Sequence, residues 1–311
     1  MDRRDFLKTL AVTGAVMTVQ RSEAMDILAQ KLTNAGGDKV DLVAVMGGEP
    51  EAMFRRAITE MGGMKQFIKP GQKVVVKPNI GWDKVPELAG NTNPKLVAEI
   101  VKQCLAAGAK EVTVFDHTCD DWQKCYKNSG IEEAAKAAGA KVMPAHLESY
   151  YKPVSLPKGV RMKSAKVHEA ILNSDVWINV PILKNHGGAN LTISMKNHMG
   201  IVWDRGFFHS NDLQQCIADI CTMDKKAVLN VVHAYRVLKT NGPRGRSASD
   251  VVLTKGLFIS QDIVAVDTAA TKFFNQVREM PLESVAHLAN GQALKIGTMD
   301  LDKLNVKRIR L

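Results

Sequence analysis

The sequence has few cysteines, and none of them form a pair with metal-binding spacing. Five cysteines occur in 311 residues, and no two are arranged as C-x-x-C, the spacing typical of zinc and iron–sulfur sites. An iron–sulfur cofactor is therefore not expected. Cys119 and Cys125 flank a predicted loop and could form a disulfide outside the cytoplasm, whereas the other three fall in helical patterns as small core residues.

The sequence also lacks a long apolar run, and it lacks a run of basic residues of the kind that binds nucleic acid. The mildly apolar stretch 9–19 contains threonine and glycine and is too short to span a membrane. The formal net charge is +10, but the basic residues do not form a run with aromatic residues between them. We therefore expect no stable membrane span and no nucleic-acid partner, and the positive charge favours an anionic ligand or surface.

The N-terminus has the features of a twin-arginine export signal. Arg3 and Arg4 begin the motif, the apolar stretch follows, and a small-x-small cleavage site ends at Ala24. We predict a signal peptide over residues 1–24 and a mature chain that starts near Met25. The twin-arginine export machinery would then be a partner, and the periplasm or cell envelope the destination. The alternative is a cytoplasmic protein with a basic N-terminal helix.

Short apolar strands alternate with amphipathic helices, and no linker or internal repeat divides the chain. Strands are expected over residues 40–46, 73–76, 112–115, 141–143, 176–180, 227–232, 251–259 and 305–311. Helices are expected over residues 51–61, 94–107, 131–138, 210–223 and 262–274, with little regular structure over 145–165, 203–209 and 238–250. Apolar strands without polar alternation belong to sheets that are covered on both faces. Residues 25–311 are thus predicted to form one α/β domain, with a mainly parallel sheet, helices on both faces and irregular insertions.

The polar loops after Val76, Phe115 and Val180 are the expected location of a binding site, because ligands of parallel sheets bind beyond the carboxyl ends of the strands. The stretch 180–200 combines lysines, asparagines and the Gly187-Gly188 pair. Lysine supplies positive charge, asparagine supplies a donor and an acceptor, and glycine lets backbone N–H groups approach a ligand. This mixture predicts a pocket for a small carboxylate or phosphate. The candidate ligand-binding residues are Lys77, Asn79, Lys184, Thr192, Lys196 and Asn197.

Three further residues are candidates for proton transfer. His186 lies within the stretch 180–200 and His209 follows it. Histidine titrates near neutral pH, although lone histidines are often structural and no spacing matches a metal site. A metal ion is therefore possible but not indicated. Asp267 lies on the apolar stripe of its predicted helix, where a carboxylate must be paired or serve a site. The alternative is a residue at the edge of the stripe that bonds to a backbone group. We expect Lys184 and Lys196 to line one cleft, with Asp267 as the best candidate for a paired carboxylate.

Several motifs resemble the prokaryotic domain-of-unknown-function family 362. They are Lys77-Pro78-Asn79, Pro181-x-x-Lys184-x-His186, Thr192, Lys196-Asn197-x-x-Gly200, Asn241-Gly242-Pro243, Ser260-x-Asp262 and Ala265-x-Asp267. The resemblance covers most of the predicted mature chain and implies a common fold and a site, but not a reaction. Some relatives carry ferredoxin-like iron–sulfur segments, which this chain lacks. Where relatives tend to have an aspartate at a strand end, this chain has His233.

Three classes of function are consistent with these features. The first is an enzyme of the cell envelope that uses lysine, histidine and aspartate for proton transfer on a small anionic molecule. The second is an exported protein that binds such a molecule without turning it over. The third is a redox accessory protein that holds a cofactor acquired before export.

Overall fold

Residues 39–311 are the part of the chain that the structure, a computed structural model, describes. The predicted signal peptide over residues 1–24 and the cleavage near Met25 lie outside the described residues and stay predictions. None of the described helices is long and apolar enough to cross a membrane.

The centre of the fold is a mostly parallel sheet. In the described part of the chain, ten strands form this sheet, with the main path β12-β1-β11-β10-β7-β2-β3-β4 and the hairpin β8–β9 attached to β10. Six of its nine strand pairs are parallel, and β11 runs antiparallel to both of its neighbours. The strands are β1 (Leu42–Met46), β2 (Lys73–Pro78), β3 (Glu111–Val114), β4 (Lys141–Val142), β7 (Val176–Val180), β8 (Ile182–His186), β9 (Asn190–Thr192), β10 (Leu229–Leu238), β11 (Val251–Ser260) and β12 (Val306–Arg310).

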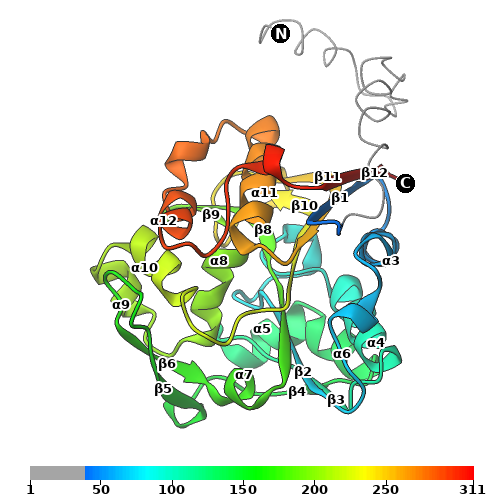
Figure 1. Cartoon of the computed structure of the whole chain (residues 1–311), viewed down its shortest axis with the longest axis horizontal. Helices are drawn as coiled ribbons and strands as arrows, with labels where there is room; N and C mark the ends of the chain where they lie inside the picture. Colours follow the sequence, from blue (N-terminus) through cyan, green and yellow to red (C-terminus); the bar gives the residue numbers. More distant parts are fainter. Residues whose placement is uncertain (1–38) are drawn as a thin grey trace, which may run out of the picture. The chain divides into compact units, whose positions relative to one another are not determined.

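Helices cover both faces of the sheet. Val74 and Val76 of β2 face a core packed by the first four helices, whereas Val75 faces a core packed by the later ones. In Figure 1, α3, α4 and α6 lie on one side of the sheet and α8, α10 and α12 on the other. The helices are α3 (Pro50–Glu60), α4 (Pro94–Ala106), α5 (Trp122–Asn128), α6 (Ile131–Ala137), α7 (Glu169–Asn173), α8 (Ser194–Asn197), α9 (Gly206–Ser210), α10 (Leu213–Ile220), α11 (Ile263–Val277) and α12 (His287–Ala293). The prediction of an α/β fold with a mainly parallel, doubly covered sheet is confirmed.

Local sequence signals explain why several elements start where predicted. Asn93 caps α4 by accepting a hydrogen bond from the N–H of Lys95, and Pro94 occupies the first turn, where its missing N–H is not needed. Asp262 caps α11 in the same way, by accepting hydrogen bonds from the N–H groups of Val264 and Ala265. These caps fix the starts of helices that pack on opposite faces of the sheet.

Three segments are more regular than the sequence suggested. Within the stretch expected to be irregular, β5 (Tyr151–Ser155) pairs with β6 (Ser164–His168) in a separate two-stranded sheet. The Gly187-Gly188 region is the turn of the hairpin between β8 and β9, and α9 interrupts the predicted loop 203–209. Strand β8 forms because its backbone pairs with the distant β10, a contact that local sequence patterns do not reveal.

Candidate functional site

The loops after four parallel strands meet at one edge of the sheet. β10, β7, β2 and β3 are consecutive parallel neighbours, so their carboxyl ends point the same way. Hydrogen bonds tie the loops that follow them: Thr92 Oγ1 donates to Val180 O (2.7 Å), the N–H of His117 to Gly200 O (3.1 Å), and the N–H of Gly242 to Asn185 Oδ1 (3.0 Å). The sheet therefore brings together segments that are far apart in the sequence.

A buried ion pair lies at the centre of this edge. Lys77 at the end of β2 is 0% exposed, and its Nζ lies 2.8 Å from Asp116 Oδ1 and donates to Asn197 Oδ1 at 2.8 Å. Asp116 follows β3, and its Oδ2 accepts from the N–H of Ile80 (2.6 Å). Burial lowers the pKa of Lys77, and the neighbouring carboxylate opposes that shift. The carboxylate thus holds a cation inside the protein.

Gly200 fits over this ion pair because it has no side chain. A Cβ at this position would lie 1.9 Å from Asp116 Oδ1 and 2.5 Å from Lys77 Nζ. The glycine of the Lys196-Asn197-x-x-Gly200 motif is therefore required by close packing.

Lys184 is the second buried cation, and it joins the same network. Its Nζ donates to Asn79 Oδ1 (3.0 Å) and to Gly90 O (2.5 Å), and Asn79 Nδ2 donates to Asn197 Oδ1 (3.3 Å). The residue is 1% exposed, and burial lowers its pKa to about 7. Its partners are neutral oxygens, so the fold does not neutralise its charge.

Lys196 is partly buried, and its hydrogen-bond partner is weaker than those of Lys77 and Lys184. Its Nζ lies 3.3 Å from Met199 Sδ, and a thioether is a poor hydrogen-bond acceptor. Burial lowers the pKa of Lys196 to about 8, and the positive charges of Arg205 and Lys77 act in the same direction. This ammonium group is the member of the network best placed to bind a ligand from solvent.

Thr192 lies beside these lysines. It faces Lys184 across the β8–β9 pair, so the two side chains project from the same face of the hairpin. The residue is 3% exposed, and its hydroxyl has no hydrogen-bond partner among the residues that the structure describes. Buried hydroxyl groups are usually bonded, so this one has capacity for a ligand.

Arg205 was not among the predicted site residues, and Cys119 was considered only for a disulfide. The Arg205 guanidinium donates to His117 O (2.9 Å) and Thr118 O (2.6 Å) and contacts Cys119 Sγ at 3.1 Å. The charge of Arg205 reaches Lys77 and lowers its pKa. The arginine comes from a segment predicted to be a loop, and no local signal marks it as part of the site. Asp116 was also missed, although it directly follows an apolar strand, which was the available signal.

The disulfide considered for Cys119 and Cys125 is not formed. Both cysteines are free; Cys119 is exposed beside Arg205, and Cys125 is buried in α5. Burial in that helix accounts for Cys125 as a small core residue.

The two predicted catalytic histidines lie at the rim of the network. His186 Nδ1 accepts from the N–H groups of Gly188 (3.0 Å) and Ala189 (2.9 Å), so its neutral ring carries the proton on Nε2. Burial, followed by the charges of nearby lysines, lowers the pKa of His186 to about 2. The ring is thus held neutral and closes the hairpin turn. His209 is exposed on α9, and its pKa is lowered by partial burial and then by Lys196.

Asp267 is not paired with a lysine, which corrects the expectation for this residue. Its Oδ1 and Oδ2 accept from the N–H groups of Ser194 (2.9 Å) and Met195 (2.8 Å) at the start of α8. Burial raises the pKa of Asp267 to about 7, and these backbone bonds oppose the shift. Asp116 is the carboxylate that pairs with a lysine. Asp267 instead positions the short helix that carries Lys196.

We expect Asp267→Asn to destabilise the protein by about 2 kcal/mol, because an amide NH₂ would face one of the two backbone N–H donors. The pKa of Asp267, raised to about 7, means that protonation stabilises the fold as pH falls from 7 toward 4. The cost of the neutral asparagine should therefore be larger at acidic than at alkaline pH, as measured by urea unfolding. An equal cost across this range would show that the carboxylate is ionised throughout.

Two further observations concern the remaining predictions. His233, at the position of the family's usual acid, is buried in β10, and neither ring nitrogen has a partner among the described residues. Burial lowers the pKa of His233 to about 3, so the ring is neutral at physiological pH. Within residues 39–311, no three His, Cys, Asp or Glu side chains are arranged to hold a metal ion.

Several known proteins are similar to this chain in sequence or in fold. A curated relative, the thylakoid-associated protein sll1697 of Synechocystis sp., is 24% identical over 227 residues, which are 71% of this chain and 68% of that protein. The lactate racemase apoprotein of Thermoanaerobacterium thermosaccharolyticum is 12% identical, with a TM-score of 0.47, over 76% of this chain and 57% of that structure. A Thermotoga maritima protein is also 12% identical, with a TM-score of 0.47, over 74% of this chain and 60% of that structure. The chain thus spans less than two thirds of either solved structure.

The family model for the domain of unknown function DUF362 matches residues 74–272. This range begins in β2 and ends in α11, and it includes the four loops that meet at the sheet edge. The match covers more than half of the chain, and the chain therefore belongs to the DUF362 family.

Proposed function

We propose that the protein is an enzyme that binds a small carboxylate or phosphate at this sheet edge and uses a lysine for proton transfer. The observation that carries the proposal is an unbalanced charge. Four cations, Lys77, Lys184, Lys196 and Arg205, lie within range of one another's charge. In the described part of the chain, Asp116 is the one carboxylate in an ion pair with any of them. When all three lysines are protonated, four positive charges less one negative leave +3.

Such an arrangement favours an anion for a physical reason. Like charges close together raise the free energy of the folded protein, and a bound anion relieves this repulsion. A carboxylate or phosphate can also accept several of the N–H donors that the lysines and asparagines direct to this place. Lys77 and Lys184 are buried and would act on the anion through their charge alone. Lys196 and Arg205 are accessible for direct contact with the anion.

Proton transfer is supported by the pKa values of the lysines. An acid or base works best when its pKa is near the pH of the reaction, and burial moves Lys184 to about 7 and Lys196 to about 8. We propose Lys196 as the group that exchanges a proton with the ligand. His186 and His209 would orient the ligand at the rim, and Asp267 would position Lys196.

We expect the affinity for acetate, which is ionised throughout this range, to fall as pH rises through about 7 and then about 8, where Lys184 and Lys196 lose their protons. An anion binds the protonated lysine better, so binding takes up protons, and affinity falls by up to about tenfold per pH unit for each proton. Calorimetric titration across this pH range measures the effect. An affinity independent of pH would contradict the assignment.

Lys196→Met should reduce the affinity for acetate and for inorganic phosphate by about tenfold or more, because one of the accessible cations is removed. The comparison is made at a pH below the pKa values of Lys184 and Lys196. Lys65→Met is the matched control, since Lys65 is exposed on the α3 side of the protein. Unchanged affinity in Lys196→Met would contradict the proposed role of this lysine.

Catalysis is tested separately, by deuterium incorporation from D₂O into the methyl group of pyruvate, followed by NMR. Exchange above the protein-free rate that is lost in Lys196→Met supports proton transfer. Binding of acetate without deuterium exchange into pyruvate would favour a non-catalytic binding protein. The twin-arginine motif supports a site of action outside the cytoplasm.

A further inference from the structure

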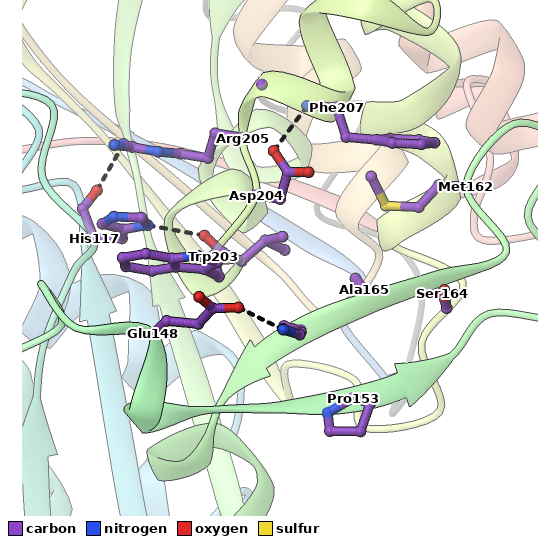
Figure 2. Close-up of a pocket in the computed structure, with 13 residues that line it drawn as sticks. His117, Glu148, Pro153, Met162, Ser164, Ala165, Trp203, Asp204, Arg205 and Phe207 are labelled. Atoms are coloured by element: carbon purple, nitrogen blue, oxygen red, sulfur yellow. Dashed lines mark hydrogen bonds and ion pairs between the residues drawn. The ribbon is translucent and has the colours of Figure 1, made fainter.

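An open groove of about 770 Å³ lies beside the cationic network, between the β5–β6 sheet and the segment 202–207. Figure 2 shows Trp203 on one side of this groove, with Phe207 and Met162 on the opposite side and Pro153 at its lower edge. The Lys166–Glu148 ion pair (2.5 Å) lies next to the indole. Apolar and aromatic side chains thus form most of the wall.

Two residues that line the groove also adjoin the cationic network. His117 lines the groove and directly follows Asp116 of the buried ion pair. Arg205 also lines it, and its guanidinium bonds to the loop that carries His117. Three of the five N–H donors of Arg205 are used in its bonds to this loop, so two remain for a ligand at the junction.

The aromatic wall has a fixed orientation. The rings of Trp203 and His117 are stacked, with centroids 5.2 Å apart and an angle of 2° between their planes. His117 Nδ1 lies 2.9 Å from Val202 O, and the N–H of Trp203 donates to Lys166 O (3.0 Å), so both the ring and the backbone are held. A wall that is ordered in advance binds a flat ligand without a large loss of side-chain entropy.

The size of the groove excludes a small ion as its complement. Acetate or phosphate would fill a small part of 770 Å³, whereas pockets of about 300–1,000 Å³ enclose organic molecules of many atoms. Of the charged residues that line it, Lys166 pairs with Glu148, Asp204 accepts from the N–H of Phe207, and Arg205 belongs to the cationic network. The groove therefore suits an uncharged, apolar part of a molecule whose charge lies elsewhere.

We propose that the ligand of this protein is an organic anion with a flat, apolar body, preferably aromatic. Its anionic group binds at Lys196 and Arg205, and its body lies in the groove against Trp203 and Phe207. This inference rests on the proposed function and adds the substrate class to it.

The test compares naphthoate, acetate and the uncharged naphthalenemethanol by calorimetry. Naphthoate should bind more than about tenfold tighter than acetate, because ring stacking and burial of apolar surface add to the anionic contact. Trp203→Ala should remove this gain without changing the affinity for acetate. Trp203 packs against the core, so Ser164→Trp, which fills the groove from an exposed position on β6, is a second variant with the same expected result.

The possible results separate this inference from the proposed function. Acetate binding with no gain for naphthoate would overturn the groove assignment and leave the anion site in place. Equal affinity for naphthoate and naphthalenemethanol would also overturn it, because the groove would then act independently of the cations. No binding of either anion would contradict both proposals. Self-association that Ser164→Trp prevents would show that the groove accepts a second copy of the chain instead.

Discussion

Asp116→Asn is expected to destabilise the protein by about 3–5 kcal/mol, because it leaves a buried lysine without its counter-charge. Lys77 is 0% exposed, and after the substitution its Nζ would keep the amide oxygen of Asn197 at 2.8 Å as a neutral acceptor. A loss of this size is a large fraction of the 5–15 kcal/mol typical of a folded domain. Urea unfolding followed by circular dichroism measures it.

The double variant Lys77→Met/Asp116→Asn should recover part of this loss, since the uncompensated charge is then absent. A matched control is Glu111→Gln, which breaks the ion pair of Glu111 with Lys141 at the protein surface. Exposed pairs contribute about 0–1 kcal/mol, so the control should change little. If Asp116→Asn costs no more than this control, the buried pair is not what holds the loops together.

Gly200→Ala is expected to cost about 3 kcal/mol, through a steric conflict with the same ion pair. The added Cβ would lie 1.9 Å from Asp116 Oδ1 and 2.5 Å from Lys77 Nζ. Neither group can move easily, because Asp116 also accepts from the N–H of Ile80 and Lys77 donates to Asn197. The fold must therefore shift its loops or separate the charges.

Gly187→Ala is the matched control for this substitution. The nearest atom to its added Cβ is Gly242 O at 3.7 Å, an ordinary van der Waals contact, and its φ is not in the left-handed region. We expect a change below about 1 kcal/mol. Similar losses for the two glycines would show that general flexibility of the stretch, and not contact with the ion pair, requires glycine at position 200.

Most of the sheet could be predicted from the sequence, because its strands are short apolar runs between clear helix caps. The runs around Val74, Val112 and Val176 predict β2, β3 and β7, and Pro94 marks the start of α4. The hairpin of β8 and β9 could not be predicted in this way. It depends on pairing with a strand about fifty residues later, and such pairing leaves no local pattern.

The site could be predicted in part. The lysine–asparagine motifs predicted that Lys77, Lys184 and Asn197 would lie together, and the structure links them through Asn79. The charge partner was predicted wrongly, because the position of Asp267 on an apolar stripe indicates burial but not its neighbours. Its carboxylate accepts backbone N–H groups instead. Arg205 has no distinguishing pattern, and only the fold brings it to the network.

The most direct test of an anion site built on these lysines is an NMR titration of protein labelled with carbon-13 lysine. Spectra of Lys184→Met and Lys196→Met would assign the two signals. We expect pKa values of about 7 for Lys184 and about 8 for Lys196 without anion, and an increase of both when inorganic phosphate is added to saturation. Ordinary lysine pKa values near 10.5 for both residues, unchanged by phosphate, would contradict the account.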